Sequence, residues 1–329
     1  MAELVGVRVA GTGSYLPERV VTNEELSQNL DTSDEWIRSR TGIGSRHFIA
    51  DDQATSDLAV AAARDAMADA GVTAEDLDLI VVCTMTPDSP MPITAALVQR
   101  ELNAPNVGGF DLNSACSGFL LGFSTVASLI RTGSSKCALV IGAETMSRIT
   151  DQSDRSTAVI FADGAGAVVL QPCEDGSSDL LAVRRGMRGD PDVLTIRGGG
   201  SRIPPSHAVI DEKKHLIEMK GRETFKFAVT TFADLIIKTC EDAGVKPTDL
   251  KAIVPHQVNM RIIEKACSRA GVNVDRLVLN IERLGNTSAA SVPIALNEGA
   301  RKKRFGPGDL VLMVAFGGGL SWASALVRW

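Results

Sequence analysis

Short, continuously apolar runs alternate with helical patterns in the first half of the chain. The runs at 79–83, 137–141 and 166–170 have the length and composition of strands that are buried on both faces. Residues 56–70 form an amphipathic, alanine-rich helical pattern, and residues 93–102 form another. Strands that alternate with helices favour a layered α/β fold over separate all-α or all-β parts.

The second half of the chain repeats this alternation. Its predicted elements are helix 225–243, strand 252–254, helix 259–270, helix 288–302, strand 310–316 and strand 323–329. Gly244 and Gly271 follow two of these helices directly, at the position where glycine commonly ends a helix. Both halves therefore predict the same kind of α/β unit.

One short pattern occurs once in each half. Asp69-Ala70-Gly71-Val72 leads through Asp76-Leu77 to Ile80-Val81, and Asp242-Ala243-Gly244-Val245 leads through Asp249-Leu250 to Ile253-Val254. Both copies read as a helix end, a capped turn and a strand, although chance similarity of short turns is the alternative. The repeat predicts two fused copies of one unit, residues 1–175 and 176–329, with a linker at 172–178.

Composition and charge narrow the classes of function. Of the 329 residues, 44% are hydrophobic and 22% are charged, as in an ordinary globular protein with a sizeable core. A net charge of −6 argues against general nucleic-acid binding, which needs a basic face. The N-terminus lacks the features of a signal peptide, and no run reaches the roughly 18 apolar residues of a membrane span. We therefore expect a cytoplasmic protein with no nucleic-acid or membrane partner.

The six cysteines include no Cys-x-x-Cys pair, so the sequence predicts neither a metal site nor a disulfide framework, and it suits a reducing compartment. Cys116 lies in Asn113-Ser114-Ala115-Cys116-Ser117-Gly118-Phe119, between an apolar run and a helical pattern. We expect it in the first turn of a buried helix capped by Asn113 or Ser114. Backbone N–H groups and the helix dipole would there lower the pKa of the thiol below its free value of about 8.5. A small buried cysteine that fills a tight helix start is the alternative.

Three further stretches carry side chains or backbone suited to chemistry. His256 follows a predicted buried strand, and Asn286 stands in a glycine turn that leads into a helix. Gly317-Gly318-Gly319 separates two predicted strands, and bare backbone of this kind can present N–H groups to a developing oxyanion. Taken singly, these could be a structural histidine, a capping asparagine and a hairpin turn.

Together, and in this order, the four stretches resemble those of the thiolase-like condensing enzymes, specifically the β-ketoacyl-[acyl-carrier-protein] synthase III family. The other matching motifs, spread over the whole chain, are Gly11–Pro17, Asp34–Ile37, Arg40–Ile43, Asp154–Thr157, Phe161–Ala167 and Ala325–Trp329. The resemblance implies a thiolase-like fold in which duplicated α/β units give a layered α-β-α-β-α architecture. It also implies a homodimer.

The resemblance gives Cys116 the role of nucleophile, with His256 and Asn286 completing a triad. The backbone N–H groups of Cys116 and Gly318 would form the oxyanion hole. The implied reaction is a decarboxylative Claisen condensation of an acyl-CoA primer with malonyl-acyl carrier protein, which initiates fatty acid synthesis. Loss of carbon dioxide removes no proton, so it needs hydrogen-bond donors at the thioester oxygen, and a neutral imidazole and a carboxamide are such donors.

Three positions separate this chain from neighbouring branches of the same superfamily. Elongating synthases have a second histidine where this chain has Asn286. Degradative thiolases carry a second cysteine just before the glycine run, where this chain has Ala315 and Phe316. Hydroxymethylglutaryl-CoA synthases need a glutamate base after the early strand, where this chain has Thr84-Met85-Thr86-Pro87.

The resemblance also implies where the substrates bind. The residues implied for coenzyme A are Thr32, Trp36, Arg40 and Arg155, and those for the acyl pocket are Met91 and Phe316. Arg261 and Lys265 fall on one helical face and, with Lys220 and Arg222, would bind the acidic acyl carrier protein. A solvated charged face is the alternative for any one of these lysines. Acyl-CoA is a substrate, so we expect no resident cofactor.

Two other functions keep the same residues in a different role. A related Cys-His-Asn condensing enzyme could act in secondary metabolism or on long acyl chains, because Met91 is flexible and does not set the chain length. A non-catalytic partner of the carrier protein would only dock and scaffold. Such proteins typically lose the nucleophile, whereas this chain has Cys116, His256 and Asn286.

Overall fold

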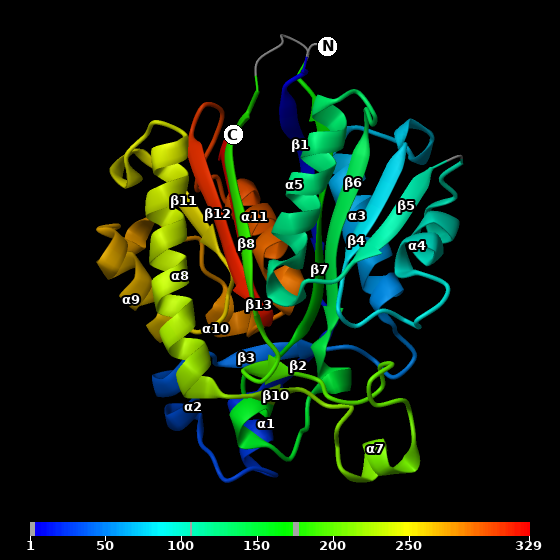
Figure 1. Cartoon of the computed structure of the whole chain (residues 1–329), viewed down its shortest axis with the longest axis vertical. Coiled ribbons are helices and arrows are strands. Elements are labelled where there is room, and N and C mark those ends of the chain that lie inside the picture. Colours follow the sequence, from blue (N-terminus) through cyan, green and yellow to red (C-terminus); the bar gives the residue numbers. More distant parts are fainter. Residues whose placement is uncertain (1–3, 106, 174–177) are drawn as a thin grey trace.

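A five-stranded mixed sheet forms the centre of the first half (Figure 1). The computed structural model describes residues 4–105, 107–173 and 178–329. The strands lie in the order β1 (Val7–Tyr15), β7 (Asp163–Pro172), β6 (Ala138–Thr145), β4 (Leu79–Cys83) and β5 (Gly108–Leu112). β4 runs parallel to β5 and β6, whereas β7 runs antiparallel to β1 and β6.

The second half contains a four-stranded sheet of the same design. Its strands lie in the order β11 (Ala252–Pro255), β12 (Leu310–Gly317), β13 (Gly319–Arg328) and β8 (Leu180–Asp190). β11 and β12 are parallel, and β13 is antiparallel to both β12 and β8. An isolated parallel bridge between Ile253 and Leu277 stands where β5 lies in the first sheet.

Helices cover both faces of both sheets and give five layers. Their bounds are α3 (Thr55–Ala70), α4 (Thr94–Leu102), α5 (Gly118–Arg131), α8 (Gly221–Asp242), α9 (Met260–Ala270) and α11 (Ser291–Arg301). One buried cluster joins α3 and α4 to the first sheet, a second joins α8 and α9 to the other sheet, and the largest packs α5 and α11 between the two sheets. This is the α-β-α-β-α architecture that the resemblance implied, and the prediction is confirmed.

The chain order shows that the two sheets are built from corresponding elements. β1, α3, β4, α4, α5, β6 and β7 have their counterparts in β8, α8, β11, α9, α11, β12 and β13. Gly71 and Gly244, which end the equivalent helices α3 and α8, adopt φ angles of 67° and 68°, a conformation that glycine reaches without strain. The expected boundary after residue 175 and positions 174–177 of the expected linker lie outside the described residues.

Smaller elements gather at the end of the molecule that carries α1 and α2 in Figure 1. They are β2 (Arg19–Thr22), α1 (Asn23–Ser27), α2 (Asp34–Thr41), β3 (Ser45–Phe48), α6 (Arg155–Ala158), β9 (Leu194–Thr195), α7 (His207–Asp211), β10 (Glu218–Met219) and α10 (Ile281–Leu284). Ile37, Ile43 and Phe48 form the small core beneath α1 and α2. None of the helices in the described ranges combines the length and the apolar composition needed to cross a bilayer.

Candidate active site

Cys116 lies in a tight turn between β5 and α5, which we call the Cys116 turn (residues 113–118). A 3-10 turn spans Ala115–Ser117, and α5 begins only at Gly118. Asn113 Oδ1 accepts the N–H of Ala115 (3.2 Å), and Ala115 has a positive φ of 45°. The expectation that Asn113 or Ser114 caps the helix with Cys116 in its first turn is confirmed only in part. Ser114 holds the N-cap position of the 3-10 turn that contains Cys116, but its side chain makes no capping bond, and Asn113 holds the turn that precedes α5.

The expected lowering of the Cys116 pKa is also wrong for the substrate-free protein. Burial raises the pKa of this thiol to about 12, and the charge of Glu144 adds to the rise, while the nearby Ser288 hydroxyl lowers it. Only 5% of Cys116 is exposed. The backbone N–H of Cys116 also lowers the pKa of the thiol, but burial is the larger cause. The resting side chain is therefore a thiol at ordinary pH.

His256 follows β11 directly, and its backbone N–H donates to the Val314 carbonyl of β12 (2.7 Å). Its Nδ1 lies 2.6 Å from Ser291 Oγ, and the N–H of Gln257 donates to the same hydroxyl (3.3 Å). A hydroxyl can both donate and accept, so Ser291 can serve either tautomer, and Nε2 can be an acceptor or a donor. Burial lowers the pKa of His256 to about 3, so the imidazole is neutral at ordinary pH.

Asn286 begins the corresponding turn of the second half, the Asn286 turn (residues 286–291). Its backbone N–H donates to the Ile160 carbonyl, and its own carbonyl accepts from Ala162 (both 3.0 Å). Its side-chain Oδ1 accepts the N–H of Ser288 (2.9 Å), which leaves the amide NH₂ as the group that a ligand can use. Asn286 is only 3% exposed. The carboxamide is therefore fixed in direction as a donor.

The two turns pack against each other, and the Cys116 turn also packs against β12. Gly317 of β12 lies so close that a Cβ there would sit 2.7 Å from the Cys116 nitrogen. The preceding residue, Phe316, packs edge-on against the His256 ring with centroids 5.7 Å apart. The end of β12 thus contacts both Cys116 and His256. The triad that we expected has its three members on elements that meet here.

A cavity of about 440 Å³ opens beside Cys116. Gly318 and Ser321 line it together with Cys116, and apolar side chains form most of the remaining wall, among them Met85, Met146, Phe161, Leu194, Ile196 and Ile217. Such a lining suits an acyl chain better than a polar substrate. No group of His, Cys, Asp or Glu side chains in the described part of the chain could hold a metal ion.

The sequence matches the model of the "3-Oxoacyl-[acyl-carrier-protein (ACP)] synthase III" family over residues 110–189, and that of its C-terminal part over residues 240–329. A Beta-ketoacyl-[acyl-carrier-protein] synthase III from Desulfitobacterium hafniense is 47% identical over 99% of this chain and 98% of its own length. The chain belongs to the β-ketoacyl-[acyl-carrier-protein] synthase III family.

Solved structures agree with this membership. The 3-oxoacyl-[acyl-carrier-protein] synthase III from Aquifex aeolicus VF5 aligns with a TM-score of 0.91 and 42% identity, over 98% of this chain and all (100%) of that one. The priming β-ketosynthase from the R1128 polyketide biosynthetic pathway aligns with a TM-score of 0.92 and 36% identity, over 99% of this chain and 97% of that one.

Three of the four side chains expected to bind coenzyme A in this synthase III family member, Trp36, Arg40 and Arg155, lie together at the surface of α2 and α6. Arg155 Cζ lies 4.7 Å and Arg40 Cζ 5.8 Å from the centre of the Trp36 ring. The buried Oγ1 of Thr32 has no hydrogen-bond partner among the described residues. An adenine stacked between Trp36 and Arg155 needs two contact distances of 3.5–4 Å, or about 7–8 Å between the two side chains. The observed separation is 4.7 Å, so Arg155 must move before an adenine can fit there.

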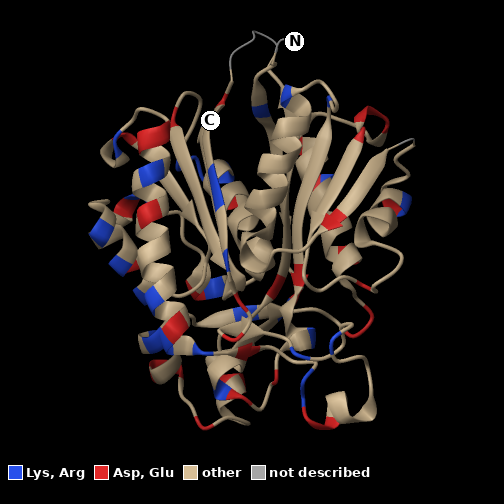
Figure 2. Ribbon diagram, viewed as in Figure 1, with Lys and Arg blue, Asp and Glu red and all other residues tan. Residues whose placement is uncertain are grey.

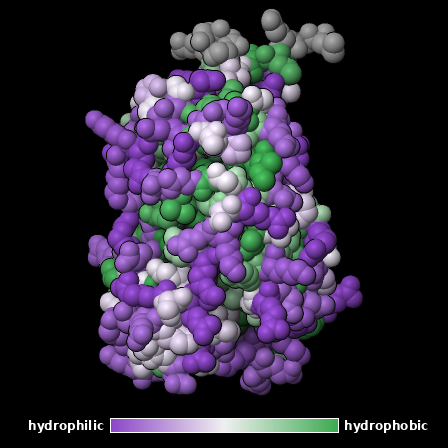
Figure 3. Space-filling view, turned by 90° about the vertical axis from the view of Figure 1, so that its left-hand side faces the viewer, coloured by the Kyte–Doolittle hydropathy of each residue, from purple (hydrophilic) through white to green (hydrophobic). Residues whose placement is uncertain are grey.

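The basic residues expected to bind the carrier protein come from two adjoining helices. Lys220 and Arg222 stand at the start of α8, Arg261 and Lys265 lie on α9, and all four are exposed. Lys265 Nζ lies 5.5 Å from the Phe225 ring of α8, so the two groups form one surface. Figure 2 shows that Lys and Arg along these helices are interspersed with acidic residues, and Figure 3 shows this face as mostly hydrophilic.

The two residues expected in the acyl pocket do not line the Cys116 cavity. Phe316 packs into the core beside α8, where it contacts Phe227 and Phe232 as well as His256. Met91 is 86% exposed on the loop between β4 and α4. In the single chain, Phe316 packs against the His256 ring, and Met91 lies at the surface.

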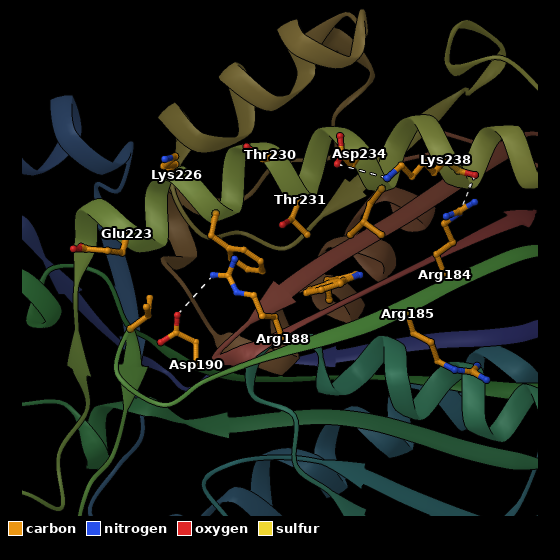
Figure 4. A pocket seen from close by; sticks show the side chains of 14 residues that line it. Arg184, Arg185, Arg188, Asp190, Glu223, Lys226, Thr230, Thr231, Asp234 and Lys238 are labelled. Carbon is orange, nitrogen blue, oxygen red and sulfur yellow. Dashed lines mark hydrogen bonds and ion pairs between the residues drawn. The ribbon is translucent and has the colours of Figure 1, made fainter.

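A larger cavity, of about 740 Å³, lies between α8 and the edge strand β8 (Figure 4). It shares no lining residue with the Cys116 cavity. Two of its arginines are already paired: Arg184 with Asp242 (2.7 Å) and Arg188 with Asp190 (3.7 Å). Charged side chains on an edge strand prevent pairing with other chains, and that role accounts for these arginines.

Four residues that shape the site had not been predicted: Glu144, Ser288, Ser291 and Gly317. Ser288 and Ser291 look like ordinary helix-start residues in the sequence, and Gly317 was seen only as part of a glycine run. Glu144 did leave a signal, since it is a charged residue at the end of a strand that is buried along its whole length.

Proposed function

We propose that this protein condenses an acyl-CoA primer with malonyl-acyl carrier protein. The products are a β-ketoacyl-acyl carrier protein, carbon dioxide and coenzyme A, and the reaction initiates fatty acid synthesis. Family membership makes the protein a condensing acyltransferase. The observation that supports the assignment within this chain is a buried thiol, Cys116, that opens into an apolar cavity beside Gly318.

In the first half-reaction, the Cys116 sulfur attacks the thioester carbonyl of acyl-CoA. The thiol proton passes to His256 Nε2 and then to the departing coenzyme A sulfur, so that free coenzyme A and an acyl-Cys116 thioester result. The neutral state of His256 supports this step, because a protonated imidazole could not accept the proton. The backbone N–H groups of Cys116 and Gly318 stabilise the tetrahedral oxyanion.

In the second half-reaction, malonyl-acyl carrier protein loses carbon dioxide. Charge then develops on its thioester oxygen, where the Asn286 amide donates a hydrogen bond. His256 donates a second one from Nε2–H after the neutral ring has changed tautomer, with Ser291 Oγ now donating to Nδ1. The fixed direction of the Asn286 carboxamide, whose oxygen already accepts from Ser288, supports this role. The resulting carbanion attacks the acyl-Cys116 carbonyl and forms the new C–C bond, and the bond from that carbonyl to the Cys116 sulfur breaks. The β-ketoacyl product leaves on the carrier protein, and the Cys116 thiolate takes up one proton from solvent to restore the thiol.

The same proposal includes a homodimer and a cytoplasmic location. Strand β5 ends the first sheet and pairs only with β4 within the described chain. Gly108 and Gly109 expose its backbone, and Met91 and Ile93 leave apolar surface exposed on the loop before α4. An unprotected edge of this kind is a template for pairing with a second copy. Cys83, Cys116, Cys137, Cys240 and Cys267 are in no disulfide, as expected of a reducing compartment.

The two other functions have less support. The Desulfitobacterium hafniense relative at 47% identity carries the synthase III name, whereas the R1128 priming ketosynthase is 36% identical. A scaffold without catalysis would have no need of Cys116 opening into a cavity, with His256 and Asn286 on the elements packed against it.

Intact-protein mass spectrometry with a panel of acyl-CoA primers tests the proposal. We expect an adduct of one acyl group on the protein, none on Cys116→Ala, and turnover of the adduct when malonyl-acyl carrier protein is added. The preferred primer identifies the chain length that the cavity takes. Absence of an adduct with every short and long primer would contradict the proposed mechanism.

A further inference from the structure

Glu144 is a completely buried carboxylate outside the proposed triad. It stands one residue before the end of β6 and has no accessible surface (0%). Within the described residues it forms no ion pair, and its partners are all hydrogen-bond donors. They are Thr84 Oγ1 (3.2 Å), Met85 N (3.1 Å), Thr86 Oγ1 (2.7 Å), Ser288 Oγ (3.0 Å) and Ala289 N (3.5 Å). Burial raises the pKa of Glu144 to about 7, so these five donors face an acceptor-only carboxylate above that pH.

The two carboxylate oxygens of Glu144 join the two halves of the chain. Oε2 accepts from the three residues that follow β4, in the first half. Oε1 accepts from Ser288 and Ala289 of the Asn286 turn, in the second half. Ser288 has a positive φ of 49°, which a non-glycine residue adopts only when its surroundings hold it there. Glu144 provides part of that restraint.

The restraint reaches both sides of the proposed reaction. The N–H of Ser288 donates to Asn286 Oδ1 and so sets the direction of the carboxamide. The Ser288 hydroxyl, which donates to Glu144, also lowers the pKa of the Cys116 thiol. In addition, the charge of Glu144 raises the pKa of Cys116, although burial is the larger cause. Removing the carboxylate should therefore disturb Asn286 while making Cys116 easier to ionise.

We propose that Glu144 is a positioning residue that holds the Asn286 turn through Ser288 and Ala289, and thereby supports condensation rather than acyl transfer to Cys116. The inference rests on the proposed function, since it assigns Asn286 to the second half-reaction. A buried carboxylate that only stabilises the fold is the competing explanation, and it predicts equal losses in both half-reactions.

Four variants separate these explanations. Glu144→Gln removes the charge. In either orientation of the new amide, its NH₂ group faces a backbone N–H, that of Met85 or that of Ala289, which cannot accept a hydrogen bond. Glu144→Asp keeps the charge but shortens the reach to Ser288. Ser288→Ala removes the hydroxyl alone. Thr84→Val is the matched control, because it removes a bond to the same carboxylate and leaves Ser288 and Ala289 in place.

Each folded variant is purified and assayed in whatever oligomeric state it adopts, and three rates are measured. They are the rate of Cys116 alkylation by iodoacetamide at about pH 8, the rate of acylation by acyl-CoA, and the rate of condensation with malonyl-acyl carrier protein. For Glu144→Gln we expect faster alkylation, undiminished acylation and about tenfold slower condensation, less than the roughly 10²–10³ that loss of a whole donor costs. Glu144→Asp should alkylate like the wild type and condense slowly. Ser288→Ala should slow condensation, and Thr84→Val should not.

The outcomes are distinguishable. Equal losses of acylation and condensation in Glu144→Gln, or a loss in Thr84→Val as large as in Glu144→Gln, would overturn the inference. If Glu144→Gln does not fold, unchanged condensation by Ser288→Ala overturns it. Failure of the wild-type protein to form any acyl adduct would instead refute the proposed function.

Discussion

The Cys116 turn and the Asn286 turn are one backbone device used twice. In each, an asparagine Oδ1 accepts the N–H two residues later: Ala115 for Asn113 (3.2 Å) and Ser288 for Asn286 (2.9 Å). Those two residues have nearly the same positive φ, 45° and 49°. In each half a 3-10 turn follows and leads into the central helix, α5 or α11. The duplication seen in the sheets therefore extends to these two turns.

The side chains carried by the two turns differ, and the difference divides the chemistry. Where the first turn has Cys116, the second has Ala289 at the equivalent position. Where β11 leads into His256, the equivalent strand β4 ends in Cys83. In the proposed mechanism, the first half thus supplies the nucleophile and the second half supplies the hydrogen-bond donors. Neither half is a site alone, and the contact between the turns creates one.

Replacing each asparagine tests this division most strongly. Asn286→Ala should reduce condensation by about 10²–10³, because it removes a buried donor to the developing oxyanion. Acylation of Cys116 should persist, which mass spectrometry with acyl-CoA can verify. Asn113→Ala is the matched variant. Asn113 is exposed, so water can replace its bond to Ala115, and both half-reactions should stay within about threefold of the wild type. Equal losses in the two variants would show that the turns share one role.

The layered fold was predictable because its strands are buried on both faces. The apolar runs at 79–83, 137–141 and 310–316 became β4, β6 and β12, with small differences in length. The glycines after α3 and α8 marked helix ends that the structure reproduces. The sequence did not predict the late start of α5, because the 3-10 turn around Cys116 depends on the Asn113 side chain and on packing against β12 rather than on periodicity.

Sequence motifs predicted the proposed triad, but they did not predict the residues that hold it in place. Ser291 lies 35 positions from His256, and Ser288 lies 144 positions from Glu144, so no local pattern connects them. The pKa of Cys116 was predicted in the wrong direction for a related reason. The helix dipole is visible in a sequence, but the burial that outweighs it arises only when β12 and the Asn286 turn close over the thiol.

Cys83 and His256 occupy equivalent positions at the ends of β4 and β11, one in each half. The pH dependence of stability tests the difference between these two residues. Burial depresses the pKa of His256 from 6.5 to about 3, so the unfolded chain gains a proton that the fold excludes as pH falls through this window. The free energy of unfolding should therefore decrease as the pH falls from 6.5 toward 3. Glu144 has the opposite effect: its pKa is raised from 4.5 to about 7, so its contribution to stability increases as the pH falls from 7 to 4.5.

Urea unfolding of His256→Asn at about pH 7.5 and about pH 5 measures this contribution, since asparagine does not titrate. Compared with the wild type, the variant should lose less stability on acidification, whatever its stability at the higher pH. Cys83→Ser is the control: burial keeps the pKa of that thiol above the whole window, so the substitution should leave the pH difference unchanged. If His256→Asn lost as much unfolding free energy between the two pH values as the wild type, the histidine would not be held neutral in the folded protein.

The smallest expected effect concerns the strained residues themselves. Ala115→Gly relieves a positive φ but increases the freedom of the unfolded chain, so the net gain in stability should be at most about 0.5–1 kcal/mol. Ser288→Gly gives the same relief and also removes the hydroxyl that donates to Glu144, a loss of about 1 kcal/mol or more for a buried bond to a charged group. The two substitutions should therefore shift the urea midpoint in opposite directions. A shift of the same sign and size in both would mean that backbone strain alone governs the two turns, and that the bond between Glu144 and Ser288 contributes nothing to holding the second one.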